Sequence, residues 1–560
     1  MRYLPPRRSL RGVRPLRWVR GALPAPVSRA APAAAVVAVP LTLAVVLRLR
    51  RLTVTSDSVA QQSVVVTWLR AGHRQTYLPP DTWLLKIPLY AAVEAIPLAP
   101  PLRLLVESVS LAVLAVALLA AGTHRLVSLA LPAGAGRSWW DVALPLAWLG
   151  TVGGGLGQYL AVMPNSRNIE LGAAVCLLAV LGGVVLAPTP RSGWRRLVRA
   201  AAAVAAVPAL ALLWVDDPYE AALVAGPLAL ACLAWLAVRP AGRAADGGAG
   251  RPGERRLLAA AAVLAGSLVA VSPLHRALAA AGVQVVPDAT GVTLDPGQLA
   301  GHLRIIPAAM AAEVGLRDPV TAADLAARIG VVTVLVAAVP AATWVAVHGW
   351  RTRQLALAFL GAHCPLVVAG VVANRTVSDF HAGRYLVLAV VDLAVAAAVA
   401  AALLRSRRPR LAAGLAALLA AATLANLVAV VFDATPRPEL AARQEQTLAV
   451  LERTGAAKGY SGFWAADLYT HQSGGRLMVS DVACSSGRLR PRHWLTDSAR
   501  TGVPAARTFV LWDPSAPDQV GCSIADVEAQ FGPPTQRISA PAGGVILLYD
   551  RDVTPLLATA

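Results

Sequence analysis

The chain has 560 residues, of which 56% are Ala, Val, Ile, Leu, Met, Phe, Trp, Tyr or Cys and only 15% are charged, with a formal net charge of +20. Soluble globular chains are usually about 45–50% apolar and about 25% charged. The composition therefore excludes an ordinary soluble domain, a collagen and a disordered tail, and it favours a membrane protein.

The basic residues stand in short arginine clusters between apolar runs. Lysine occurs only at positions 86 and 458, so these clusters consist almost entirely of arginine. Such clusters are typical of the cytoplasmic loops of membrane proteins, whereas a nucleic-acid site needs a basic face on a folded domain. We therefore expect the lipid bilayer as a partner, and no nucleic acid.

Eleven apolar segments approach the length that spans a bilayer, which is about 20 residues. They are residues 31–50, 103–122, 140–162, 169–188, 200–215, 219–238, 257–274, 330–349, 355–373, 385–404 and 411–431. Arginine clusters follow alternate segments, and short loops between them, such as 216–220, are acidic or mixed. This alternation predicts a polytopic α-helical protein of the plasma membrane with about eleven spans and its N-terminus inside.

The segments divide the chain into three parts. Residues 1–30 form a basic cytoplasmic N-terminus, and residues 31–431 form a transmembrane domain with two long outside loops at 51–102 and 275–329. An odd number of spans places residues 432–560 outside the membrane. Turn-forming residues and a strand-like run at 544–549 predict that this part is a small α/β or α+β ectodomain.

Two of the five cysteines, Cys484 and Cys522, lie in this polar C-terminal part. In an oxidising compartment they can form a disulfide; the alternative is two free, buried thiols. The other three cysteines lie in apolar runs, where cysteine behaves as a small buried hydrophobic residue. Because no Cys/His cluster has metal-ligand spacing, we predict no metal ligand.

The first outside loop combines polar and charged residues that can support chemistry. Ser56 or Asp57 can cap a helix that begins there, and the residues that follow have the spacing of a helix lying along a membrane surface. A proline-containing segment with Asp81 and Lys86 then leads into the second span.

This arrangement resembles the GT-C superfamily of membrane glycosyltransferases that use polyprenyl-phosphate sugars, which includes protein O-mannosyltransferases and aminoarabinose transferases. In that class an acidic residue just after the first span is catalytic, and Asp57 occupies that position. Residues 163–172 look like the second short polar loop of the class, the pair Arg384-Tyr385 is similar to one found late in such chains, and residues 459–464 resemble the start of ectodomains in actinobacterial-type relatives. Position 58 is Ser where several families have a second acid, which leaves the use of a divalent metal open.

The resemblance implies transfer of a sugar from a polyprenyl-phosphate-linked donor to a glycan, lipid or protein acceptor of the cell envelope. Asp57 is then the general base that takes the proton of the acceptor. Arginine suits the donor phosphate because its planar side chain binds two oxygens at once. The candidates for the lipid-linked phosphate are Arg48, Arg50 and Arg51, and the candidates for substrate binding are Asp81, Lys86, Arg167, Arg384 and Tyr385.

Simpler interpretations of the same residues stay open. Asp57 and Asp81 also fit as helix caps, and the arginines at 48, 50 and 51 also fit as side chains that reach lipid headgroups. The whole chain could instead be a transporter or flippase of a lipid-linked intermediate, for which Asp392 is a candidate ionisable group inside a span. A non-catalytic protein of envelope assembly is the third alternative.

Overall fold

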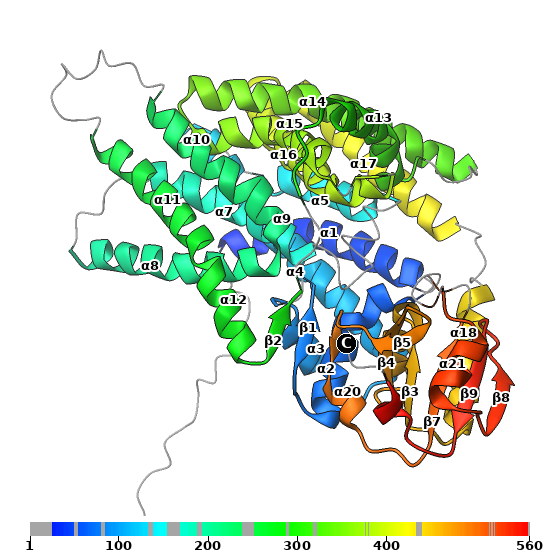
Figure 1. Cartoon of the computed structure of the whole chain (residues 1–560). Helices are drawn as coiled ribbons and strands as arrows, with labels where there is room; N and C mark the ends of the chain where they lie inside the picture. The colour runs from blue at the N-terminus through cyan, green and yellow to red at the C-terminus, as the bar shows by residue number, and fades with distance from the viewer. Residues whose placement is uncertain are drawn as a thin grey trace, which may run out of the picture.

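The computed structural model describes residues 25–49, 54–79, 84–132, 138–153, 168–186, 193–237, 251–286, 291–316, 322–375, 377–378, 380–432, 439–513, 516, 519 and 521–557. Apolar helices form one part of the molecule, and a smaller region with a β-sheet, residues 439–557, lies at one end of it (Figure 1). We call these the helical part and the C-terminal region.

A helix lies at each of the eleven predicted apolar segments. These helices are α1 (Ala25–Leu49), α4 (Pro100–Ala130), α5 (Trp140–Thr151), α7 (Asn168–Leu186), α8 (Gly193–Asp216), α9 (Pro218–Glu220) with the π-helical turn η2 (Ala221–Ala225) and α10 (Gly226–Ala237), α11 (Arg251–Val269) with α12 (Val271–Ala280), α14 (Ala322–Arg351), α15 (Leu355–Ala373), α16 (Val387–Arg407) and α17 (Pro409–Phe432). Among the described residues, six helices are long and apolar enough to cross a membrane: Pro100–Ala130, Glu254–Ala280, Ala322–Arg351, Leu355–Ala373, Val387–Arg407 and Pro409–Phe432. The prediction of a multi-pass helical protein is confirmed at this level, and the number of eleven spans stays a prediction.

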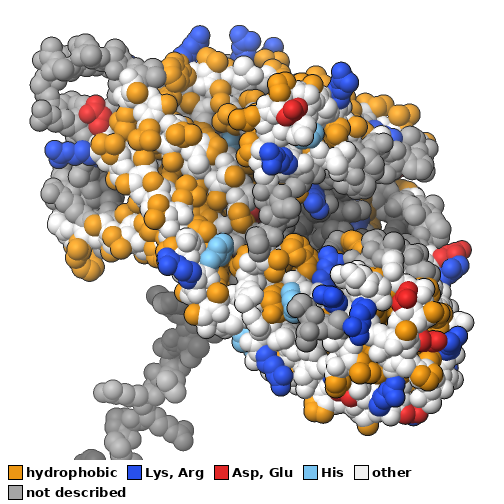
Figure 2. Space-filling view, in the orientation of Figure 1, with side chains coloured by type: hydrophobic (Ala, Val, Ile, Leu, Met, Phe, Trp, Pro, Cys, Tyr) orange, Lys and Arg blue, Asp and Glu red, His pale blue; other side chains and the backbone are white. Residues whose placement is uncertain are grey.

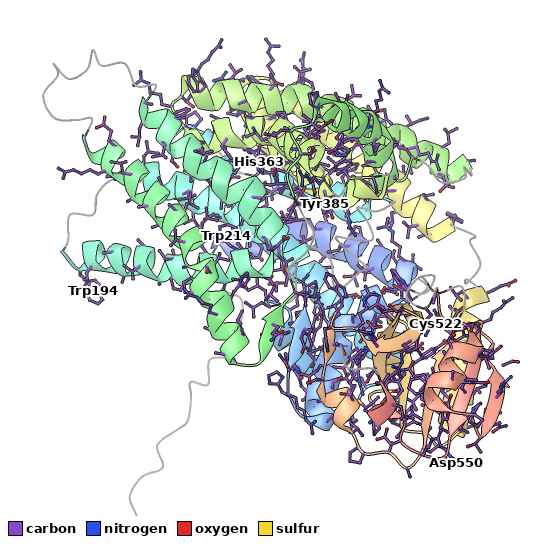
Figure 3. The ribbon with its side chains drawn as sticks, in the orientation of Figure 1. Trp194, Trp214, His363, Tyr385, Cys522 and Asp550 are labelled. Carbon is purple, nitrogen blue, oxygen red and sulfur yellow. A yellow bond between two sulfur atoms is a disulfide. The ribbon has the colours of Figure 1, made fainter. Side chains whose placement is uncertain are left out.

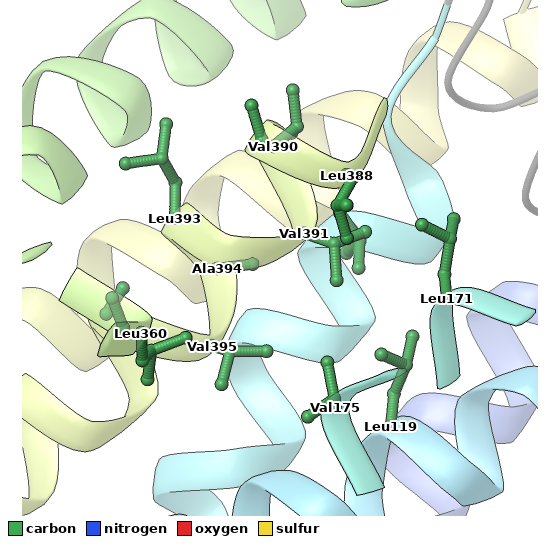
Figure 4. Close-up of a cluster of buried hydrophobic side chains, with 14 of the residues drawn as sticks. Leu119, Leu171, Val175, Leu360, Leu388, Val390, Val391, Leu393, Ala394 and Val395 are labelled. Atoms are coloured by element: carbon green, nitrogen blue, oxygen red, sulfur yellow. The ribbon is translucent and has the colours of Figure 1, made fainter. Parts of the chain in front are cut away.

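Helix α16 is the centre of the helical part. Nearly all of its side chains are buried, from Val387 to Leu403, because its sequence is apolar all round and rich in Ala and Val. A helix without a polar face is stable only when other helices surround it, and small side chains let those helices approach closely. Figure 4 shows Val391 and Val395 of α16 beside Leu360 of α15, Leu119 of α4 and Val175 of α7.

The two long loops that the sequence predicts contain regular elements. Loop 51–102 holds α2 (Ser56–Ala71), β1 (Thr76–Leu78) and α3 (Ile87–Glu94), and loop 275–329 holds β2 (Val283–Val285) and α13 (Pro296–Glu313). Strand β1 pairs in parallel with β2 and antiparallel with β6 (Thr496–Asp497) of the C-terminal region. One three-stranded sheet therefore joins both long loops to the C-terminal region.

The C-terminal region is a three-layer α/β structure. Its elements are α18 (Glu439–Arg453), β3 (Lys458–Ser461), α19 (Phe463–Gln472), β4 (Met478–Ser485), β5 (Arg488–Pro491), β6, α20 (Ala499–Gly502), β7 (Thr508–Trp512), α21 (Ile524–Phe531), β8 (Gln536–Ser539) and β9 (Val545–Tyr549). The sheet has the order β5-β4-β3-β7-β9-β8, with β4, β3 and β7 parallel. Apolar residues of α18 and α19 cover one face, and those of α21 cover the other. Cys484 and Cys522 form a disulfide with an S–S distance of 2.00 Å.

Helix α2 is buried between the helical part and the C-terminal region (Figure 1). Residues 58–67 are buried without exception, so the prediction of a helix on a membrane surface is wrong. Arg500 explains why polar residues of α2 tolerate this burial. Its guanidinium is fully buried and donates to Ser63 Oγ at 2.7 Å and Thr67 Oγ1 at 2.8 Å of α2, and to Asp467 Oδ1 of α19 at 2.7 Å.

A second polar contact holds the end of α2 to the C-terminal region. The carboxylate of Asp497 accepts hydrogen bonds from Trp68 Nε1 at 3.0 Å and Thr76 Oγ1 at 2.6 Å, and its Oδ2 lies 3.0 Å from Nδ1 of His73. Burial alone would raise the pKa of Asp497, but the hydrogen bonds from Thr76, the Ala499 backbone, His73 and Trp68 hold it below its usual value.

This lowered pKa predicts how the contact depends on pH. A carboxyl group with a lower pKa in the folded state stabilises fully above its ordinary pKa, about 3.9 for Asp, and loses that contribution as the pH falls through the folded value. Asp497→Asn should therefore lower the unfolding temperature at neutral pH, and its difference from the wild type should shrink below about pH 4. Thermal unfolding of both proteins across pH measures this. A difference that stays constant down to the lowest pH would contradict it.

Candidate functional site

A buried ion pair marks the start of α3. Lys86 occupies the N-cap position of this helix, and its ammonium group lies 3.3 Å from Oε1 of Glu170, in the first turn of α7. Both side chains are fully buried. Ionised groups are expensive to bury without a partner, so each of these two residues depends on the other. The sequence predicted Lys86 as a substrate-binding residue but did not single out Glu170.

The carboxylate of Asp216 binds the backbone of the two residues that precede Lys86. Asp216 is the last residue of α8, it is fully buried, and its Oδ1 accepts hydrogen bonds from the backbone N–H groups of Leu84 and Leu85. The approach to α3 is thereby fixed to the end of α8. Three ionisable side chains from distant parts of the sequence, Lys86, Glu170 and Asp216, thus lie at the junction of α3, α7 and α8.

Two more buried acids, Glu94 and Glu107, lie between Lys86 and the C-terminal region; we call the row of buried acids with Lys86 the polar seam. Gln62 of α2 donates to Glu107 of α4 at 3.2 Å. Glu94, at the end of α3, pairs with Arg103 and lies 3.4 Å from Nε2 of His471 in α19. The acids Glu94, Glu107, Glu170 and Asp216 therefore follow one another between the helical part and α19, all of them buried.

The acidic turn at 216–220 connects this seam to the predicted Arg-Tyr pair. Asp217 caps α9 by accepting the Tyr219 backbone N–H at 3.0 Å. The Tyr219 hydroxyl in turn donates to the backbone carbonyl of Tyr385, and the two tyrosine rings are 5.3 Å apart. The turn therefore connects Tyr385, through Tyr219, to the end of α8 that contacts Leu84 and Leu85. In Figure 3, Tyr385 lies nearer to the C-terminal region than His363 does.

Arg384 and Tyr385 belong to the 3-10 helix η4 (Phe380–Tyr385), which leads into α16. The exposed Arg384 donates to the Tyr385 hydroxyl at 2.9 Å, and its guanidinium carbon lies 4.9 Å from the centre of the Tyr385 ring. These contacts orient a cation that still faces solvent. An oriented, accessible arginine is able to bind a phosphate with two hydrogen bonds.

Glu313, the last residue of α13, packs against η4. A β-carbon on Gly383 would lie 2.7 Å from the backbone carbonyl oxygen of Ala309 in α13, so only glycine permits this close approach of η4 to α13. Burial raises the pKa of Glu313 to about 8, although the nearby Arg384 works in the opposite direction. A carboxyl group with such a pKa exchanges protons near neutral pH, which suits acid–base chemistry. The sequence analysis did not identify Glu313.

The remaining predicted residues are placed as follows. Asp57 lies in the first turn of α2, whose N-cap is Thr55, so Asp57 itself is not the cap; its side chain lies outside the described residues. Asp81, Arg167, Arg50 and Arg51 also lie outside them. Arg48 donates from Nη2 to the carbonyls of Thr151 and Val152 at 2.8 Å each, so it binds the C-terminal end of α5.

No group of three His, Cys, Asp or Glu side chains that could hold a metal ion occurs in the described part of the chain. The chemical groups of the site are several buried carboxyl groups, the buried ammonium group of Lys86 and the oriented guanidinium of Arg384. Glu170 and Asp216 were visible in the sequence as acids at the ends of apolar segments, where ionisable residues are expensive and are commonly functional.

Breaking the Lys86–Glu170 pair tests how far the site depends on it. Lys86→Met leaves buried acids without their cation, which costs about 3–5 kcal/mol when one partner of a buried pair is removed. Lys86→Met with Glu170→Gln should restore most of the thermal stability, because the uncompensated charge is gone. The exposed pair Arg507 and Asp550 is the matched control, and its double-mutant coupling energy should be about 0–1 kcal/mol. If the losses of thermal stability in the two single variants simply add up in the double variant, Lys86 and Glu170 do not depend on each other.

Comparison with known proteins gives a similarity in fold over most of the chain. No protein-family profile and no curated protein matches the chain. Its fold is similar to the crystal structure of ArnT from Cupriavidus metallidurans in the apo state, with a TM-score of 0.49, 12% sequence identity, and coverage of 95% of this chain and 99% of that one.

Proposed function

We propose that this chain transfers a sugar from a polyprenyl-phosphate-linked donor to an acceptor of the cell envelope, with Asp57 as the general base. The observation that carries the proposal is the position of α2. The helix that holds Asp57 in its first turn follows the first apolar helix and is fixed, by buried contacts, beside the seam that contains Lys86. An acid in this position is also the feature on which the resemblance to the GT-C superfamily depends.

The chemistry assigns a role to each group. The acceptor hydroxyl oxygen forms a bond to the anomeric carbon of the sugar, the bond from that carbon to the donor phosphate breaks, and Asp57 takes the hydroxyl proton. The first turn of a helix favours an ionised carboxylate because the backbone dipole is positive there. The leaving polyprenyl phosphate carries the negative charge that develops, and it needs a cation.

Lys86 and Arg384 are the cations that we assign to this phosphate, with Tyr385 orienting Arg384. Lys86 is held by Glu170, so a phosphate has to compete with Glu170 for the ammonium group. Asp81, Arg167, Arg50 and Arg51 remain candidates for donor or acceptor binding on sequence grounds. Arg48 also remains a candidate for the lipid-linked phosphate on sequence grounds, although its Nη2 is bound to the carbonyls of α5.

We further propose that the reaction takes place on the outer face of the plasma membrane, with residues 432–560 outside. The disulfide between Cys484 and Cys522 supports this placement, since disulfides persist in oxidising compartments. The three-stranded sheet supports it too, because β1, β2 and β6 place both long loops on the side of the C-terminal region.

The test is Asp57→Asn in membranes that contain the full chain and no wild-type copy. We measure incorporation of labelled hexose and pentose from polyprenyl-phosphate donors into envelope material. Loss of a general base should slow transfer by roughly 100-fold or more, while thermal unfolding stays unchanged. Glu439→Gln, an exposed acid of α18, is the control and should leave transfer intact.

A transporter or flippase of a lipid-linked intermediate is the second candidate, because His363 and Asp392 form a buried pair inside the helical part. Nδ1 of His363 lies 2.8 Å from Asp392 Oδ2, and Nε2 donates to the Leu223 carbonyl in the π-helical turn η2 at 2.8 Å. Buried ionisable pairs inside spans are typical of proton-coupled transport. Normal labelled transfer by the Asp57→Asn protein would overturn the role of Asp57 as the base. Transfer that is equally fast in membranes without the chain would overturn the glycosyltransferase proposal and favour this alternative.

A further inference from the structure

A β-hairpin extends past the carboxyl end of the parallel strands in the C-terminal region. Ser461, the last residue of β3, pairs with Asp481, but β4 continues to Ser485 before β5 returns. The two turn residues, Ser486 and Gly487, have φ angles of 53° and 69°. Two left-handed residues define the tight type I′ turn that matches the twist of the strands.

This hairpin is held firmly on one of its faces. Cys484 in β4 is tied by the disulfide to Cys522, and Leu489 in β5 packs into the apolar cluster under α21. Gln530 of α21 completes the hold, because its side-chain amide donates to the Leu489 carbonyl at 2.9 Å and accepts the Leu489 N–H at 2.8 Å. These bonds also occupy the free edge of β5, so the edge cannot add another strand.

The opposite face of the hairpin is basic. Side chains alternate between the faces of a strand, so Arg488, Arg490 and Arg492 lie together on the face that Leu489 does not use. The N–H of Arg492 extends the ladder to the Asp481 carbonyl at 3.0 Å, which keeps all three in the same register. Figure 2 shows Lys and Arg side chains gathered over this part of the C-terminal region.

The three arginines differ in their ion-pair partners. Arg492 has Asp481 at 3.9 Å and keeps about a third of its side chain exposed. In the described part of the chain, neither Arg488 nor Arg490 forms an ion pair, and the buried Nε of Arg490 has no hydrogen-bond partner. Arginines held at fixed spacing on a rigid hairpin are suited to oxygens of phosphate or carboxylate groups.

Aromatic rings extend the same surface. The guanidinium of Arg492 lies 5.1 Å from the centre of the Phe463 ring, and that ring is 5.3 Å from the ring of Trp464. Trp464 is 43% exposed although it is among the largest apolar side chains. Exposed tryptophan combines an apolar face with a hydrogen-bond donor, which suits the mixed surface of a sugar ring. Phe463 itself is buried, and it links Arg492 to Trp464, so that Trp464 is the exposed aromatic side chain beside the arginine row at the start of α19.

We infer that this surface, made by Arg488, Arg490, Arg492 and Trp464, binds an anionic glycan that carries phosphate or carboxylate groups. The arginines bind the anionic groups, and Trp464 stacks on a sugar ring next to them. The identification of this glycan as the acceptor rests on the proposed sugar transfer. The binding of the glycan to this surface does not depend on that transfer.

An anionic membrane surface is the competing partner, because arginine and tryptophan also contact lipid headgroups. The structure favours the glycan. Peripheral membrane binding depends on a broad apolar face that enters the bilayer, whereas this surface offers one exposed aromatic side chain beside a charged row. The disulfide and Gln530 also fix the spacing of the arginines, which favours a ligand with spaced charges.

The test measures binding to the full chain in nanodiscs of neutral phosphatidylcholine. The probes are fluorescent oligogalacturonate, poly(glycerol phosphate) of similar length and neutral dextran. We expect one or both anionic glycans to bind and dextran not to bind, with the better anionic probe identifying carboxylate or phosphate as the preferred group. Arg488→Gln, Arg490→Gln and Arg492→Gln together should weaken binding by roughly tenfold or more, and Trp464→Ala should weaken it as well.

Matched controls separate this site from general charge effects. Arg443→Gln, Arg453→Gln and Arg476→Gln remove the same charge from exposed positions that do not belong to the arginine row, and Trp194→Ala removes an exposed tryptophan of α8. Both should leave binding unchanged. Equal losses in the control and test proteins would overturn the inference, as would binding only to phosphatidylglycerol vesicles. Loss of transfer in Asp57→Asn with glycan binding retained would show that the two proposals stand separately.

Discussion

The placement of α2 depends on the buried guanidinium of Arg500. Its hydrogen bonds join two hydroxyl groups of α2 to the carboxylate of Asp467, and none of these groups reaches solvent. A buried charge is stable only when its partners satisfy it. Because Arg500 and Asp467 come from the C-terminal region, the first loop and that region have to fold against each other.

This constraint organises the candidate site. Helix α2 carries Asp57 at one end and contacts Glu107 through Gln62 near its middle. Helices α3 and α7 bring Lys86 and Glu170 together beside it. The site is thus built from the first loop, the ends of apolar helices and the C-terminal region, and α2 connects the three. The arginine face of β5 lies on the same region, at the start of the helix that packs on α2.

The sequence predicted what depends on local hydropathy. Each apolar segment falls on a helix, and the polar C-terminal part forms a sheet structure. The surface placement of α2 was wrong because Ser63 and Thr67 look like a solvent face, while their partner Arg500 is more than four hundred residues away. Glu170 was overlooked for the same reason, because its ion-pair partner Lys86 lies on a different helix.

The most direct test of this account is amide hydrogen exchange of α2 in the Arg500→Met protein. The account predicts faster exchange at residues 58–67 than in the wild type, with intermediate exchange in Arg500→Lys, because lysine keeps the charge but loses the planar fork. Arg476→Met, which breaks an exposed pair with Glu452, should leave α2 protected. Unchanged protection of α2 in the Arg500→Met protein would contradict the claim that this interaction holds the helix in place.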